Sequence, residues 1–215
     1  MLNTIKSYAK INLFLNVVDK LDTGFHELNS VLSRIDLYDE IRIKDESSFS
    51  ISYNGPFGDQ VGSNDHISKL FNYLIDKNYL KQKSFAIHVV KNIPVGSGLG
   101  GGSSNVAEII KYLIRSNLLD NSSSTEIARD LGSDIEFFID EGSALISGKG
   151  NVDQRLKINS DKHFLIVFPN VQNSTKDIFN KHSNLSGEKF SYNKDTNLDG
   201  ILKGTSNELE KTALL

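Results

Sequence analysis

Apolar residues recur at every second position near the start of the chain, from Ile11 to Val17, and the positions between them include the polar Lys10 and Asn12. A period of two predicts a β-strand with two distinct faces, and it puts Lys10 and Asn12 on the same face. Further strand-like runs follow along the chain. They cover residues 31–37, 40–44, 49–53, 85–90, 144–147 and 163–168.

Elsewhere the apolar pattern takes the period of a helix. A first helix, with its N-cap at Ser63 or Asn64, carries one apolar stripe. The stripe consists of Ile67, Leu70, Phe71, Leu74 and Ile75. Later helices are predicted from about residue 103 and over residues 124–131, 176–182 and 208–215. Gly132 is expected to end the helix over residues 124–131 in a left-handed C-cap. A polar stretch over residues 156–162 indicates a boundary between two domains, residues 1–156 and 157–215.

Composition and charge narrow the classes of protein. The chain of 215 residues is 24% charged, with a net charge of -3, and nucleic-acid-binding proteins normally present a basic face instead. No run approaches the roughly 20 apolar residues of a membrane span, and the N-terminus lacks the apolar run of a signal peptide. We therefore expect no nucleic-acid partner, no membrane partner and a cytoplasmic location. The absence of cysteine excludes disulfides, and the five histidines show no metal-binding spacing.

Five of the 16 glycines lie within residues 94–107, whose sequence is PVGSGLGGGSSNVA. A flexible surface loop is one explanation for them. However, the glycines directly precede a predicted helix, whose first N–H groups lack intrahelical partners and whose dipole favours an anion. Glycines also let the preceding backbone wrap closely around a phosphate. The pattern therefore favours a phosphate-binding loop.

Two common phosphate-binding motifs do not account for this loop. A Walker A motif needs a lysine before its serine or threonine, and no lysine lies between Gly96 and Ser104, which excludes a P-loop NTPase. Gly96, Gly98 and Gly101 do match G-x-G-x-x-G. A dinucleotide-binding fingerprint directly follows a strand, however, whereas residues 91–94 intervene here. Dinucleotide binding is therefore disfavoured.

Three stretches together resemble the GHMP kinases, the family of galactokinase, homoserine kinase, mevalonate kinase and phosphomevalonate kinase. IPVGSGLGGGSSNVA is similar to the nucleotide-binding glycine motif of that family. AKINLFLNV with DTGFHELNSVL, and LGSDIEFFIDEGSALISGKG, resemble motifs of the branch that acts on a cytidylyl sugar alcohol. The resemblance implies an α+β fold, with an ATP-binding domain of the ribosomal protein S5 type over residues 1–156. A ferredoxin-like domain over residues 157–215 is expected to be incomplete, because family members extend beyond this length.

The activity implied by the resemblance is ATP-dependent phosphorylation of the 2-hydroxyl of 4-diphosphocytidyl-2-C-methyl-D-erythritol in isoprenoid precursor synthesis. Mg²⁺ is expected to accompany ATP, although the sequence identifies no metal ligands. The partners are then small molecules, and the chain is expected to be a monomer or a weak homodimer. Two alternatives stay open. One is a GHMP kinase for another alcohol, such as homoserine or mevalonate, and the other is an inactive nucleotide-binding remnant without the C-terminal glycine motif of the family.

The resemblance also assigns roles to single residues. It implies that Asp134 accepts the proton of the substrate hydroxyl and that Lys10 orients Asp134 and offsets negative charge. The structural alternatives are a capping box of Ser133 and Glu136 around Asp134, and a solvated strand lysine at position 10. The residues implied in ATP binding are Pro94, Val95, Gly96, Ser97, Gly98, Leu99, Gly100, Gly101, Gly102, Ser103 and Ser104, with Asn64 and Lys91 near the adenine. The residues implied in binding the second substrate are Asn12, Phe25, His26, Thr175 and Phe179, with an aromatic ring stacked on the cytosine.

Overall fold

Strands and helices are mixed along the chain in a computed structural model, which describes residues 4–22, 24–63, 65–81, 84–158, 162–169, 175–182, 185, 187, 189–190, 198–203 and 207–213. The strands are β1 (Thr4–Lys20), β2 (His26–Asp45), β3 (Ser50–Asn54), β4 (Phe85–Val90), β5 (Ser143–Gly148) and β6 (Asn151–Leu156). The helices are α1 (His66–Asp76), α2 (Gly101–Arg115), α3 (Ser124–Leu131), α4 (Ile135–Ile139), α5 (Thr175–Lys181), α6 (Leu198–Leu202) and α7 (Glu210–Ala213).

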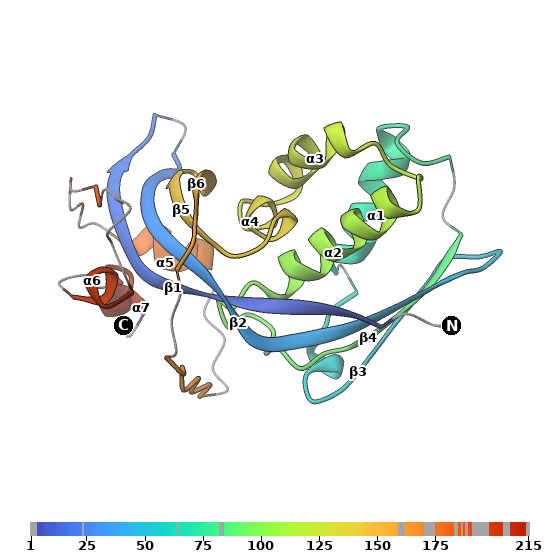
Figure 1. Ribbon diagram of the computed structural model, residues 1–215, viewed down its shortest axis with the longest axis horizontal. Helices are drawn as coiled ribbons and strands as arrows, with labels where there is room; N and C mark the ends of the chain where they lie inside the picture. Colours follow the sequence, from blue (N-terminus) through green and yellow to red (C-terminus); the bar gives the residue numbers. More distant parts are fainter. Residues whose placement is uncertain are drawn as a thin grey trace. The chain divides into compact units, whose positions relative to one another are not determined.

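The chain forms two compact units, and the long strands β1 and β2 contribute residues to both. Unit 1 consists of Met1–Ala9 and Asp36–Asp140. In this unit β4 pairs antiparallel with β2 and parallel with β3. Helices α1 to α4 gather on one side of these strands (Figure 1), and α2 packs against both α1 and α4. The largest fully buried side chains of the unit include Leu70, Phe71, Ile87, Ile110, Phe137 and Phe138.

Unit 2 consists of Lys10–Ile35 and Glu141–Leu215. Here β5 pairs antiparallel with β2 and with β6. One apolar cluster forms the core, and it consists of Leu13, Phe14, Val31, Leu145, Leu156, Leu198 and Ile201. The segment before α7 is held to β1, because the backbone N–H of Val17 donates to Oε2 of Glu208 at 2.5 Å.

Most of the predicted elements are present, with changes at their ends. Strand β4 has the predicted bounds, and the predicted strands 31–37 and 40–44 are one continuous strand, β2. The predicted cap of the first helix is wrong. Asp65 caps α1, because its Oδ1 accepts hydrogen bonds from the backbone N–H groups of Ile67 and Ser68 at 2.8 and 2.9 Å.

Two other local predictions are wrong. Residues 162–169 are not a strand, and Leu165 and Val167 are 89% and 79% exposed. An alternating apolar pattern is not sufficient for a strand, because a strand also needs a hydrogen-bonded neighbour. Gly132 has a φ of 166° and is extended, so it does not form the left-handed cap. The two-domain division at residue 156 stays a prediction. None of the helices in the described part of the chain is both long and apolar enough to span a membrane.

Candidate active site

Three glycines of the loop before α2 adopt a backbone conformation that other residues rarely reach. Gly96, Gly98 and Gly100 have φ values of 71°, 74° and 71°. A residue with a Cβ is strained in this left-handed region. Within the loop, the hydroxyl of Ser97 donates to the carbonyl of Pro94 at 2.8 Å. The loop therefore has a defined shape that requires glycine at three positions.

Gly101 and Gly102 open α2 and are glycines for a different reason. A Cβ on Gly101 would lie 2.7 Å from Nζ of Lys91 and 2.9 Å from Cγ2 of Ile93. A Cβ on Gly102 would lie 2.7 Å from Nδ1 of His66. These distances are shorter than normal van der Waals contacts. The side chains of Lys91 and His66 thus lie directly against the first turn of α2.

The start of α2 leaves backbone N–H groups available to a ligand. The cap residue is Gly100, which has no side chain that could cap the helix. Its carbonyl accepts a hydrogen bond from the N–H of Ser104 at 2.8 Å. The N–H groups of residues 101–103 precede this first bond of the helix. The buried hydroxyl of Ser104 accepts a hydrogen bond from that of Ser7 at 2.8 Å, which joins α2 to β1. Over 15 residues, the aligned peptide dipoles favour an anion at this end.

A buried ion pair holds the segment that leads into the loop. Nζ of Lys91 lies 2.6 Å from Oδ2 of Asp39, and their side chains are 5% and 0% exposed. The other oxygen of Asp39 accepts from the backbone N–H groups of Asn92 and Ile93, each at 2.8 Å. Burial lowers the pKa of Lys91, although the carboxylate of Asp39 acts in the opposite direction. The role predicted for Lys91 at the adenine stays a prediction, and Asn64 lies outside the described residues.

Asp134 lies in unit 1, directly before α4. It holds the N-cap position, but its side chain makes no capping hydrogen bond to the helix. The carboxylate of Glu136 is bound by Arg129, with Nε to Oε2 at 3.0 Å and Nη2 to Oε1 at 2.7 Å. Because the N-cap of α4 is Asp134, Ser133 and Glu136 do not hold the positions of a capping box. Asp134 is accordingly not required to cap this helix.

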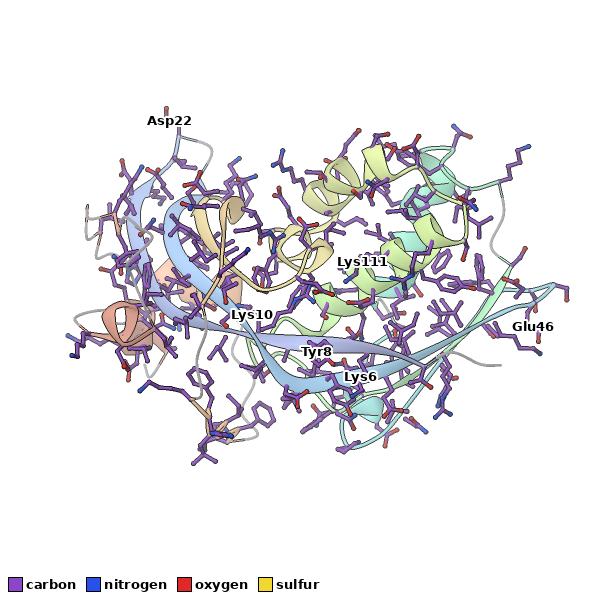
Figure 2. All side chains as sticks on the ribbon, viewed as in Figure 1. Lys6, Tyr8, Lys10, Asp22, Glu46 and Lys111 are labelled. Carbon is purple, nitrogen blue, oxygen red and sulfur yellow. The ribbon has the colours of Figure 1, made fainter. Side chains whose placement is uncertain are left out.

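The short helix α4 is tied to both of its neighbouring helices. The Arg129–Glu136 ion pair joins it to α3. On the other side, Lys111 of α2 donates to the carbonyl of Phe138 at 3.1 Å (Lys111 is labelled in Figure 2). These contacts fix the turn that carries Asp134.

Lys10 lies in unit 2, on β1 (Figure 2), and is only 6% exposed. Its Nζ donates to Oδ1 of Asn12 at 2.8 Å, Nδ2 of Asn12 donates to Ser30 at 2.9 Å, and the Ser30 hydroxyl donates to the carbonyl of Phe14 at 2.5 Å. The predicted shared face of Lys10 and Asn12 is confirmed. The alternative of a solvated lysine is wrong, because this hydrogen-bonded series holds a buried ammonium group in place.

Aromatic side chains predicted to bind the second substrate also lie in unit 2. The rings of His26 and Phe179 stack, with centroids 5.4 Å apart and an angle of 29° between their planes. Phe25 is 59% exposed, and Nζ of Lys149 lies 4.6 Å from the centre of its ring. Burial and neighbouring positive charges lower the pKa of His26, which favours a neutral imidazole. The side chain of Thr175 lies outside the described residues.

The described part of the chain contains no group of three or more histidine and acidic side chains that could hold a metal ion. Mg²⁺ usually binds through one or two carboxylates together with phosphate oxygens of the substrate. Among the described residues, therefore, protein side chains alone do not form a complete metal site.

Comparison with curated proteins decides the family. The chain is 36% identical over 215 residues to the 4-diphosphocytidyl-2-C-methyl-D-erythritol kinase of Pelagibacter ubique, and the alignment covers 98% of this chain and 76% of that protein. The chain belongs to the 4-diphosphocytidyl-2-C-methyl-D-erythritol kinase family. It is also 32% identical over 209 residues to the protein of the same name from Caldicellulosiruptor saccharolyticus, with coverage of 96% and 72%. Residues 65–145, which contain the glycine loop and Asp134, match the GHMP kinases N terminal domain.

Solved structures confirm the predicted GHMP kinase fold of this member of the 4-diphosphocytidyl-2-C-methyl-D-erythritol kinase family. A crystal structure of 4-(cytidine 5'-diphospho)-2C-methyl-D-erythritol kinase matches with a TM-score of 0.69 at 24% identity, over 99% of this chain and 77% of that one. The mevalonate kinase of Methanococcus jannaschii matches with a TM-score of 0.51 at 17% identity, over 73% and 56% of the two chains.

Three residues of this kinase-family site were missed by the sequence motifs. Asp39 holds Lys91, Ser7 holds Ser104, and His66 lies against α2, yet all three come from outside the glycine motif. Asp39 lies between the predicted strands 31–37 and 40–44, and only the continuous strand β2 of the structure shows that this carboxylate is buried and therefore paired. Nothing in the local sequence around Ser7 or His66 distinguishes them from other polar residues.

Proposed function

We propose that this member of the 4-diphosphocytidyl-2-C-methyl-D-erythritol kinase family transfers the γ-phosphate of ATP to the 2-hydroxyl of 4-diphosphocytidyl-2-C-methyl-D-erythritol. One observation carries the proposal. The loop with three left-handed glycines leads into a 15-residue helix that begins with two more glycines, against which the side chains of Lys91 and His66 lie. Such an arrangement suits the phosphates of a nucleotide. The names of the relatives support the choice of acceptor.

In the proposed nucleotide site, the backbone from Pro94 to Ser104 surrounds the phosphates. The N–H groups of residues 101–103 donate to phosphate oxygens, while glycine at positions 101 and 102 makes room for the side chains of Lys91 and His66 against the helix. The ion pair of Lys91 and Asp39 keeps residues 91–93 in place, so the loop begins from a fixed point. Catalysis of phosphoryl transfer depends mainly on such positioning and on charge stabilisation.

The proposed reaction assigns one proton transfer to the chain. Asp134 accepts the proton of the 2-hydroxyl while the hydroxyl oxygen bonds to the γ-phosphorus, and the bond from the γ-phosphorus to the bridging oxygen breaks to release ADP. The role proposed for Lys10 is to orient Asp134 and to offset negative charge, and its ammonium is fixed by Asn12. Mg²⁺ bound together with ATP would supply further charge neutralisation to the phosphates.

The proposed cytidine-binding residues are Phe25, His26 and Phe179. A neutral imidazole offers one donor and one acceptor to the cytosine, and an aromatic ring offers a stacking surface. The contact between His26 and Phe179 and the large exposed surface of Phe25 support this assignment. Asn12 and Thr175 are proposed as further substrate contacts.

The test is turnover with a defined acceptor. The chain is incubated with ATP, Mg²⁺ and 4-diphosphocytidyl-2-C-methyl-D-erythritol, ADP release is measured, and the product is examined by ³¹P NMR. We expect a new phosphomonoester signal that the Asp134→Asn variant produces far more slowly. Equal or better turnover of homoserine or mevalonate would replace the proposed acceptor. ATP binding without turnover of any acceptor would support the inactive remnant.

A further inference from the structure

His66 is the first residue of α1, and its position is set by the capping residue before it. Asp65 accepts hydrogen bonds from two backbone N–H groups of α1 and, at 2.7 Å, from the hydroxyl of Tyr53 on β3. The helix therefore begins at a fixed point. The imidazole of His66 extends from this point toward the first turn of α2, within the same unit.

The imidazole lies flat against the backbone of Gly102. A Cβ built on Gly102 would lie 2.7 Å from Nδ1, 3.1 Å from Cε1 and 3.2 Å from Cγ of His66. Three atoms of one ring at similar distances indicate that the ring covers this α-carbon. As a whole, His66 is an exposed residue. One side of the imidazole therefore lies against α2, at the helix turn proposed to bind phosphate.

Charges around His66 favour a neutral ring. Partial burial and the positive charges of Lys69 and Lys91 lower its pKa, while Asp65 acts in the opposite direction. A neutral imidazole carries one N–H donor and one acceptor nitrogen. Among the described residues, no protein group forms a hydrogen bond with this side chain. The donor is therefore available to a ligand.

We propose that His66 contacts the bound nucleotide by donating a hydrogen bond from its imidazole to a phosphate oxygen. This proposal rests on the proposed function, which puts the phosphates of ATP at the first turn of α2. Fixed by Asp65 and Gly102, the ring loses little freedom when the phosphate binds. His66 would then be a nucleotide-binding residue outside the glycine motif, on a different helix from that motif.

The test compares ligands with and without phosphate. The affinities of ADP and of adenosine are measured by calorimetry for the unaltered chain and for three variants, His66→Ala, His66→Gln and the control His88→Ala. His88 lies in the same unit on β4, where it pairs with Ser52 at 2.9 Å. We expect His66→Ala to weaken ADP binding about tenfold, as loss of a hydrogen bond to a charged group does, and to leave adenosine binding within a factor of two. His66→Gln keeps a donor and should restore most of the ADP affinity.

Kinetics supply a second measurement. His66→Ala should raise KM for ATP about as much as it weakens ADP binding, while KM for the cytidylyl substrate stays unchanged. Unchanged ADP affinity in His66→Ala, or equal weakening of ADP and adenosine, would overturn the phosphate contact. A chain that binds ADP normally but phosphorylates no acceptor would overturn the proposed reaction and leave the contact standing. Failure of the unaltered chain to bind ADP would overturn both.

Discussion

Lys91 and Asp39 form an ion pair, 2.6 Å from nitrogen to oxygen, and the same nitrogen would lie 2.7 Å from a Cβ on Gly101. The pair joins β2 to the segment that follows β4, and it lies against the first residue of α2. An ammonium group and a carboxylate thus support the glycine loop from its protein side. Since the two charges compensate each other, the pair fixes the backbone without adding net charge.

Breaking this pair on one side should destabilise unit 1 strongly. Asp39→Asn leaves the ammonium group buried without a countercharge, a change that typically costs about 3–5 kcal/mol in the free energy of unfolding. Asp39→Asn combined with Lys91→Met should lose much less than the sum of the two single variants. Urea denaturation measures all three. Lys44→Met, at the exposed pair with Glu46, is the control and should change little. Additive losses at Asp39 and Lys91 would contradict the coupling.

Gly102→Ala should change the free energy of unfolding in opposite directions in the unaltered chain and in a His66→Ala variant. In the unaltered chain the new methyl group meets the His66 ring, and overpacking of this kind costs roughly 1–3 kcal/mol of stability. In a His66→Ala background the obstacle is gone, and replacing a helical glycine should stabilise the chain by about 0.5–1 kcal/mol. The free energies of unfolding of the four proteins give the comparison. The same sign in both backgrounds would mean that His66 does not limit the space at Gly102.

Replacing Asp134 by asparagine should affect the reaction and leave the fold nearly unchanged. Loss of a general base reduces kcat by on the order of 10²-fold or more. The melting temperature should stay close to that of the unaltered chain, because the Asp134 side chain makes no capping hydrogen bond to α4. Asp130→Asn is the matched control, since Asp130 binds the hydroxyl of Tyr73 on the exposed surface. A preserved kcat with a large fall in melting temperature would assign Asp134 a structural role.

The sequence was most informative where the interacting residues are close along the chain. The shared face of Lys10 and Asn12 followed from a spacing of two residues, and their hydrogen bond agrees with it. The start of α2 followed from the glycines that precede it. By contrast, the partner of Lys91 is 52 residues away along the chain, and no local sequence pattern predicts a contact over this separation. The alternating run at residues 163–168 shows the same limit, because the existence of a strand depends on a partner elsewhere in the chain.

Local rules also failed where two residues compete for one role. Ser63 and Asp65 are both good N-caps, and it is the Asp65 side chain that accepts from the N–H groups of Ile67 and Ser68. Ser133 and Glu136 have the spacing of a capping box, but Arg129 binds the Glu136 carboxylate in two places. In both cases tertiary contacts decide between options that the sequence leaves nearly equal in energy.

The pH dependence of stability should reflect two histidines. The pKa values of His26 and His66 are lowered in the folded chain, so the unfolded chain binds more protons as the pH falls through the usual value of about 6.5. The free energy of unfolding should therefore fall from pH 7.5 to pH 5.5. A double variant with glutamine at both positions should show a flatter profile over this range. The lowered pKa of Asp65 acts separately, since the stability it contributes is lost only below about pH 4. Urea midpoints that stay constant or rise toward pH 5.5 would contradict the assignment to these histidines.

The aromatic side chains of unit 2 should control the affinity for the cytidylyl substrate and leave that for ATP unchanged. Phe25→Ala and Phe179→Ala each remove a ring that could stack on the cytosine, and such stacking contributes roughly 1–3 kcal/mol per base in nucleic-acid-binding proteins. KM for the cytidylyl substrate should therefore rise by about one to two orders of magnitude. Phe164→Ala is the control, because Phe164 is an exposed ring of the same unit with no proposed contact to substrate. Phe179→Ala should also change the chemical shifts of the His26 ring protons, since the two rings stack. Steady-state kinetics with each substrate varied in turn make the measurement. If both alanine variants keep the cytidylyl KM within a factor of two, these rings serve packing and the cytidine lies elsewhere.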